Sequence, residues 1–228
     1  MAELFAGGAV VSVVRSARRK RTIAIRVADG VVTVRAPVRT PSPEIEDLLR
    51  QRSAWINDRL ARDAARPGPR RFAGGERLPY LGSEIVVCRC APERKRATVD
   101  LDGDVLHVSS GEGRVRDAVV CWYRSRAAVV FGEAVARWSA ACGLAPRSVL
   151  VRDQKHRWGS CGPDGTIRLN WRLVMAEQRV IEYVVVHELA HLRHKNHGPE
   201  FWAEVAGLVP DHRVWRRRLR AVGSGLVV

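Results

Sequence analysis

Four of the seven histidines in this 228-residue chain lie between residues 187 and 197. His187, Glu188 and His191 form the pattern HExxH. Residues four positions apart return to nearly the same face of an α-helix, because the helix turns by about 100° per residue. The two imidazoles could therefore bind one zinc ion, and Glu188 could reach a water molecule on that ion. The pattern predicts a metal centre that activates water.

A catalytic zinc site needs a third protein ligand and keeps one position open. His197 lies six residues after His191 and would face away, about 240° round, if the helix continued. The helix must therefore end before His197. Asn196 and Gly198 accept left-handed backbone, and the residue before Pro199 avoids the helical region, so this segment favours such an end. His197 is the predicted third ligand.

Other interpretations of these residues stay open. Glu200 and Glu204 are rival third ligands, because some HExxH enzymes use a downstream carboxylate. A buried helix could carry two histidines without binding metal, and a binding module could hold zinc for structure alone. A structural zinc site has no use for a base, so Glu188 argues against the binding module.

The elements around these residues predict an α+β protein. Residues 1–110 are expected to form a β-rich N-terminal portion with one helix over residues 43–65, in which Trp55 packs in the core. A hairpin should turn at Asp29 and Gly30, since Asp-Gly between alternating apolar residues is a strong turn signal. Four short strands are expected between residues 76 and 108.

The second part, residues 111–228, should be the catalytic domain. Apolar residues at helical spacing predict a long helix over 114–142, and a Gly at position 143 would end it. A strand over 149–152 and a hairpin between residues 156 and 171 should come next. The metal helix is predicted over 178–194, followed by helices over 199–208 and 211–222.

The composition is that of a globular protein, with 46% hydrophobic and 28% charged residues. The longest apolar runs are far shorter than the ~20 residues that a membrane span needs. The N-terminus lacks the basic and apolar regions of a secretory signal. We therefore expect a cytoplasmic protein without a membrane partner. No pattern indicates an oligomeric state.

The five cysteines form no regular disulfide framework, so reduced thiols are expected. Cys88 and Cys90 fall in a predicted strand. We expect them at alternate positions of it, one side chain facing inward and the other outward, and no second metal site built from cysteines.

The formal net charge is +15, and 35 of the 39 basic residues are arginines. Such a balance suits a polyanionic partner, nucleic acid first. The alternative is a general preference for arginine codons, with the positive charge as a side effect. The two interpretations have similar weight, because the chain has no DNA-binding motif.

Four blocks of sequence together resemble the YgjP-like zinc metallopeptidases. These blocks are Arg157–Cys161, Ile167–Trp171, Tyr183–His191 and Asn196–Trp202. The last block is also similar to SprT-like proteases, some of which degrade proteins crosslinked to DNA. The resemblance implies a zincin-like metallopeptidase domain, with the HExxH helix packed on a small sheet. It extends over nearly the whole chain.

The resemblance implies that His187, His191 and His197 bind Zn²⁺ and that Glu188 is the general base. The substrate would be a protein or peptide. A DNA-associated protease and a hydrolase of a non-peptide amide are the alternatives. Peptide hydrolysis usually needs a second donor for the oxyanion. The candidates for this donor are Tyr183, His156, Arg157 and Arg172. Trp158 begins a strand that we expect at the cleft rim, where it could pair with substrate.

Overall fold

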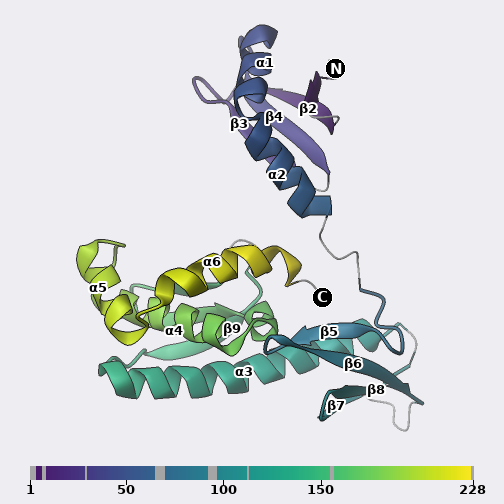
Figure 1. Cartoon of the computed structure of the whole chain (residues 1–228), viewed down its shortest axis with the longest axis vertical. Helices are drawn as coiled ribbons and strands as arrows, with labels where there is room; N and C mark the ends of the chain where they lie inside the picture. The colour runs from purple at the N-terminus through teal and green to yellow at the C-terminus, as the bar shows by residue number, and fades with distance from the viewer. Residues whose placement is uncertain are drawn as a thin grey trace. The chain divides into compact units, whose positions relative to one another are not determined.

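The computed structural model describes residues 4–6, 9–28, 30–64, 70–91, 97–111, 113–154 and 157–226. The chain forms two compact units, residues 1–68 and residues 69–228 (Figure 1). The boundary predicted from the sequence lay at residue 110 instead. Val87 and Leu106 from the intervening strands are buried in one core with Val119 and Tyr123 from the long helix. The strands therefore belong to the second unit.

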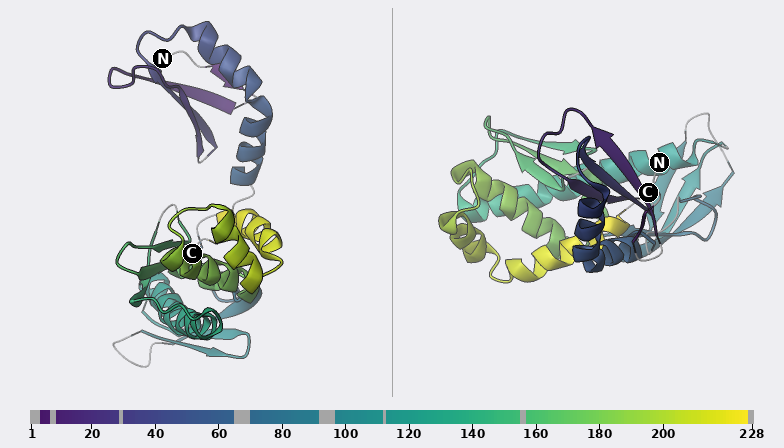
Figure 2. Two further views of the ribbon diagram at one scale, coloured as in Figure 1. Left: turned by 90° about the vertical axis from the view of Figure 1, so that its left-hand side faces the viewer. Right: turned by 90° about the horizontal axis from the view of Figure 1, so that it is seen from above.

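The first unit is a four-stranded sheet with two helices against it (Figure 2). The strand order is β1-β2-β4-β3, with bounds β1 Leu4–Ala6, β2 Ala9–Ser16, β3 Ala24–Ala28 and β4 Val31–Pro37. Strands β3 and β4 form the predicted antiparallel hairpin. Gly30 in its turn has a φ of 72°, a conformation that glycine adopts without steric cost. Asp29 lies outside the described residues.

The single helix predicted over residues 43–65 is two helices, α1 (Ser42–Gln51) and α2 (Ser53–Ala64). The chain leaves the helical region at Arg52, with φ −100° and ψ 9°. This break lets Leu49 from α1 and Ile56 from α2 both reach the core on the sheet. The placement of Trp55 in the core was wrong, because its side chain is 42% exposed.

The second unit contains two sheets. The first has the order β5-β6-β8-β7, with bounds β5 Arg77–Tyr80, β6 Ser83–Cys90, β7 Thr98–Asp102 and β8 Val105–Ser109. The second has the order β10-β11-β9, with bounds β9 Ser148–Arg152, β10 Gly159–Cys161 and β11 Thr166–Asn170. Strand β10 therefore lies at an edge of its sheet.

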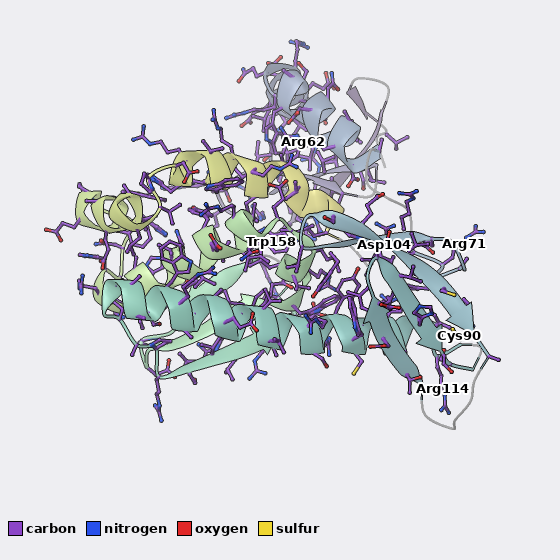
Figure 3. The ribbon with its side chains drawn as sticks, turned by 60° about the horizontal axis from the view of Figure 1, so that its bottom comes forward. Arg62, Arg71, Cys90, Asp104, Arg114 and Trp158 are labelled. Atoms are coloured by element: carbon purple, nitrogen blue, oxygen red, sulfur yellow. The ribbon has the colours of Figure 1, made fainter. Side chains whose placement is uncertain are left out.

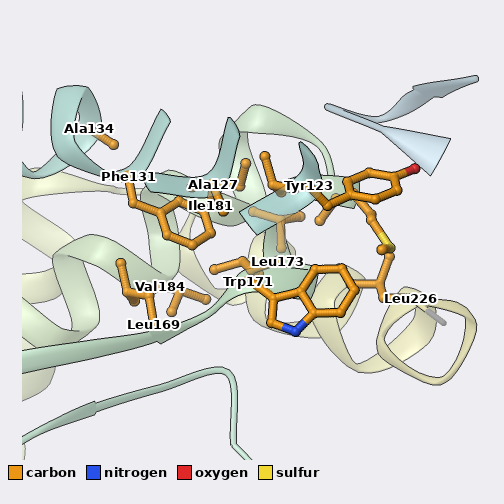
Figure 4. Close-up of a cluster of buried hydrophobic side chains, with 14 of the residues drawn as sticks. Tyr123, Ala127, Phe131, Ala134, Leu169, Trp171, Leu173, Ile181, Val184 and Leu226 are labelled. Atoms are coloured by element: carbon orange, nitrogen blue, oxygen red, sulfur yellow. The ribbon is translucent and has the colours of Figure 1, made fainter. Parts of the chain in front are cut away.

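The helices of this unit follow the predicted order. They are α3 (Val115–Cys142), α4 (Gln178–Arg193), α5 (Pro199–Leu208) and α6 (His212–Val222), with short 3-10 helices at Trp171–Met175 and Gly223–Gly225. Helix α3 ends where predicted, at Gly143 in left-handed backbone with φ 67°. Phe131, Trp171 and Ile181 are buried where α3, the first 3-10 helix and α4 meet (Figure 4). This core fixes α4, the helix that carries the HExxH residues.

A tight turn ties the first sheet to the start of α4. Leu81 donates its backbone N–H to Val174 at 2.9 Å. The next residue, Gly82, has a φ of 83°, and a Cβ there would lie 2.6 Å from a side-chain carbon of Glu177. Glu177 precedes α4 and accepts the guanidinium of Arg218 from α6. The turn, α4 and α6 are therefore held together at one point.

The predicted fold class is confirmed: the chain is α+β, with the HExxH helix packed on a small sheet and N-terminal strands. Among the residues that the structure describes, no helix is long and apolar enough to cross a membrane.

Candidate active site

Helix α4 is buried over most of its length and becomes exposed in its last turn. Val185 and Val186 are fully buried, so the helix is anchored in the core. The helix ends at Arg193, before His197, as predicted. The end is made differently, however. His194 leaves the helix in extended backbone, with φ −109° and ψ 107°. Gly198, which precedes a proline, is also extended rather than left-handed.

Three imidazoles converge beyond this helix end. The Nε2 atom of His197 lies 3.1 Å from Nε2 of His187 and 3.2 Å from Nε2 of His191. Two nitrogens bound to one tetrahedral zinc at 2.0–2.1 Å would be about 3.3 Å apart. The spacing of the three nitrogens therefore fits a single metal ion.

The outer nitrogens of the rings support the same arrangement. Nδ1 of His191 lies 2.9 Å from the carbonyl oxygen of His194, so the proton belongs on Nδ1 and the lone pair on Nε2. Burial, followed by the neighbouring His191 and His197, lowers the pKa of His187 to about 3. Burial also lowers the pKa of His197. Neutral imidazoles are the form that binds a metal.

Aromatic side chains from α5 and α6 surround the imidazoles. The ring of Phe201 lies 4.5–4.9 Å from each of the three histidine rings, centroid to centroid. Trp202 stacks on His197 at 5.8 Å and on the buried His212 at 5.6 Å. The indole of Trp202 also carries the guanidinium of Arg216 at 4.8 Å. These contacts restrict the ring of His197, although His197 itself lies outside a helix.

Glu188 is 4% exposed, and its Oε2 atom has no hydrogen-bond partner among the described residues. Burial raises the pKa of Glu188 from 4.5 to about 7, and the guanidinium of Arg157 opposes this rise. The strand β10 passes directly beside the carboxylate, because a Cβ on Gly159 would lie 2.5 Å from its Oε1. A carboxyl group with a pKa near neutrality is suited to exchange protons with substrate.

The two carboxylates that rivalled His197 point elsewhere. Glu204 forms an ion pair with Arg193 at 2.7 Å and lies 2.8 Å from Nε2 of His194. The side chain of Glu200 is 88% exposed and lies 3.8 Å from Nδ1 of His194. Glu204 therefore ties α5 to the end of α4, and the position beside His187 and His191 is left to His197.

The predicted oxyanion and substrate residues separate into two groups. Tyr183 is buried one turn before His187, with ring centroids 5.9 Å apart, and the charge of Arg157 acts on Glu188. Trp158 packs close to Gly223 at the end of α6. Arg172 instead pairs with Asp153 and covers the ring of Trp171 at 4.4 Å, in a separate pocket. His156 lies outside the described residues.

Sequence reasoning missed four residues at this site: Gly159, Trp202, His212 and Arg216. Burial raises the pKa of the Tyr183 phenol, and the positive charge of Arg216 opposes that rise. The same charge lowers the pKa values of His187 and His197, so Arg216 lies near the imidazoles. No spacing rule connects α6 with α4. The sequence signal for Gly159 and Trp202 was their place in two of the blocks that resemble the family, without a role for either residue.

Comparison with known protein families gives a match over most of the chain. A family model described as the YgjP-like metallopeptidase domain matches residues 21–222. No curated protein is similar enough to count as a relative.

Two solved structures are distant neighbours. One is the metallopeptidase zymogen abylysin of Pyrococcus abyssi, which is 23% identical with a TM-score of 0.38 and covers 42% of this chain and 99% of its own. The other is the zymogen jannalysin of Methanocaldococcus jannaschii, which is 19% identical with a TM-score of 0.34 and covers 39% and 94%. No site residue is assigned from these distant neighbours. Since the family model covers most of the chain, this protein belongs to the YgjP-like metallopeptidase family.

Proposed function

We propose that this metallopeptidase is zinc-dependent, with His187, His191 and His197 as metal ligands and Glu188 as general base. One observation carries the proposal: three Nε2 atoms converge at the end of the helix that also holds the buried Glu188, whose Oε2 has no partner among the described residues. The donor set suits zinc, which binds neutral imidazoles tetrahedrally and keeps a position open in catalytic sites.

A zinc ion held there supplies a bound water of lowered pKa and polarises the substrate carbonyl. Glu188 accepts the proton of the attacking water and later donates it to the leaving amine. Burial raises the pKa of Glu188 in the metal-free protein, and this effect favours acceptance of a proton by the carboxylate. Phe201 and Trp202 restrict the imidazoles by packing on them.

We further propose that an extended substrate pairs with β10. This strand is the edge of its three-stranded sheet, and its residue Gly159 is in contact distance of Glu188. A peptide added at that edge would bring a carbonyl carbon to the carboxylate through backbone hydrogen bonds. Tyr183 is the proposed oxyanion donor, since it is the buried candidate beside His187.

The deciding experiment compares the wild type with Glu188→Gln, using a casein-type peptidase assay and zinc analysis on the same samples. Activity lost with zinc retained is the expected result. The matched control is Glu200→Gln, which removes a carboxylate near the site that is 88% exposed. Equal activity in wild type and Glu188→Gln would overturn the role of the base. Loss of zinc from Glu200→Gln would instead make Glu200 the third ligand.

A second candidate function is a protease that acts on DNA-bound proteins. It is favoured by α6, on which Arg216 lies near the imidazoles. This helix carries five exposed arginines: Arg213, Arg216, Arg217, Arg218 and Arg220. If these residues bind DNA, the logarithm of the affinity should fall linearly with the logarithm of the salt concentration. Fluorescence anisotropy with single- and double-stranded DNA checks this, and a flat salt response would exclude it.

A further inference from the structure

The outer face of the β5–β8 sheet carries a second group of metal-binding side chains. Strands β6 and β8 are parallel neighbours, and their register pairs Cys88 with His107. Cys90 follows two residues after Cys88, so both thiols lie on the same side of β6. The expectation that one faced inward and the other outward was therefore wrong, because side chains in a strand repeat every two residues.

This face points away from the core of the unit. Val87 on β6 and Leu106 and Val108 on β8 are buried, and they alternate with the three polar residues. Cys88, Cys90 and His107 are each half-buried. Cys90 lies at the end of the sheet, well away from Trp158 at the candidate active site (Figure 3). The group is therefore separate from the three histidines.

The donor atoms are close enough to share one ion. The two sulfurs and one imidazole nitrogen all lie within 4.8 Å of one another. Sγ of Cys90 and Nδ1 of His107 are 3.8 Å apart. In a tetrahedral zinc site, with Zn–S near 2.3 Å and Zn–N near 2.05 Å, this separation would be about 3.6 Å. The separation of Cys90 and His107 is therefore within a few tenths of an ångström of that geometry.

The chemistry of the group favours a borderline-soft divalent cation. Thiolate and imidazole ligands select zinc over magnesium or calcium, which prefer oxygen. Two thiolates balance the charge of one divalent ion. Asp100 on β7 pairs with His107 in the register, so a further negative charge lies on the neighbouring strand. Nothing in this group resembles Glu188, since no carboxylate is part of it.

We propose that Cys88, Cys90 and His107 form a second zinc site, which cross-links β6 to β8, with water in the fourth position. Binding deprotonates the two thiols and releases their protons, because the thiolate is the ligand. The ion would join two neighbouring strands through Cys90 and His107, which are 17 residues apart in the sequence. The proposal does not depend on the peptidase mechanism.

Cobalt(II) titration of the metal-free full-length protein tests this proposal. Cobalt bound by thiolates gives a near-ultraviolet charge-transfer band, which the three histidines of the active site cannot produce. We expect two equivalents of cobalt in the wild type and a thiolate band. The variant Cys88→Ser/Cys90→Ser should bind one equivalent without the band. Its remaining equivalent at the histidines shows that the protein still folds.

The matched control is Cys121→Ser, which removes an exposed thiol on α3. It should keep both equivalents and the band, whereas His107→Ala should weaken the band. A single equivalent without a thiolate band in the wild type would overturn the proposal. A band that survives in Cys88→Ser/Cys90→Ser but disappears in Cys121→Ser would do so as well.

Discussion

The two groups of potential metal ligands in the second unit differ in how their donors come together. On α4, helical periodicity brings His187 and His191 to one face, and the chain returns with His197 after the helix end. On the β5–β8 sheet, strand register brings Cys88 and His107 together. The first group lies beside a buried carboxylate and under aromatic rings, and the second faces outward with neither.

This difference separates binding from catalysis. Converging donors are sufficient to hold a cation, and both groups have them. Only the α4 group adds Glu188, a carboxyl group whose pKa burial has raised to about 7. The edge strand β10 lies beside that carboxyl group. We propose that reactivity depends on the neighbours of the imidazoles, and four substitutions test how the two groups differ.

The largest effect is expected from Glu188→Gln. A general base contributes about 10²–10⁴-fold to rate, so kcat should fall by that order while both metal equivalents remain. Steady-state kinetics with peptide substrates, run beside metal analysis, measures the two quantities together. A loss of less than about tenfold would mean that the α4 group is reactive without its carboxylate. Glu188 would then not be what distinguishes the two groups.

The next largest effect is expected from Gly159→Val. A Cβ at this position would lie 2.5–2.9 Å from three atoms of Glu188, so the carboxylate must move. A displacement of about 1 Å at a catalytic group can cost about 10²-fold in rate. Zinc content should not change. The control is Gly132→Ala, since a Cβ there has nothing within 4 Å. Full activity in Gly159→Val would show that β10 does not set the position of the base.

A smaller effect is expected from Trp202→Ala, which removes the ring stacked on His197 at 5.8 Å. Residues that orient a metal ligand typically change metal affinity by about 10–100-fold. Competition with a chelating dye measures the affinity, and Trp202→Phe should restore part of it. The Cys88 group provides an internal reference. Unchanged affinity would mean that the aromatic packing around His197 has no part in metal binding.

The smallest effect is expected from Asp153→Asn, because Asp153 belongs to neither group of ligands. Its hydrogen bond from Arg172 lowers its pKa below 3.8. The stabilisation is therefore fully present above pH 3.8 and disappears as pH falls through the lowered pKa. Asp153 is 43% exposed, so Asp153→Asn should cost no more than about 1 kcal/mol at pH 7. Denaturant unfolding at pH 7 and pH 3 measures the difference, and an equal cost at both would contradict it.

Local spacing determined what could be predicted from sequence. The convergence of His187, His191 and His197 follows from helical period and one helix end, all within 11 residues. The hairpins and the end of α3 follow equally local signals at Gly30 and Gly143. The predicted domain boundary at residue 110 was wrong, because Val87 and Tyr123 are buried in one core. Such a contact between distant segments cannot be recognised from a local sequence pattern.

The contacts that sequence missed join distant segments. Gly159 touches Glu188 across 29 residues, and Arg216 reaches Trp202 from another helix. Arg172 was one of the candidate oxyanion donors, yet its guanidinium covers Trp171 instead. The prediction for Cys88 and Cys90 was wrong for a different reason. Residues two positions apart in a strand face the same side, whereas the prediction put these two side chains on opposite sides.

The short span between His187 and His197 also has a consequence for the order of folding. Closing a loop of about 10 residues takes roughly 10–100 ns, far less than the assembly of a domain. The three histidines can thus meet as soon as α4 forms. Burial of Glu188 also needs β10 to pack beside it, a contact between residues 29 positions apart. Because contacts over a longer stretch of chain form more slowly, the three histidines would converge before the carboxylate is buried.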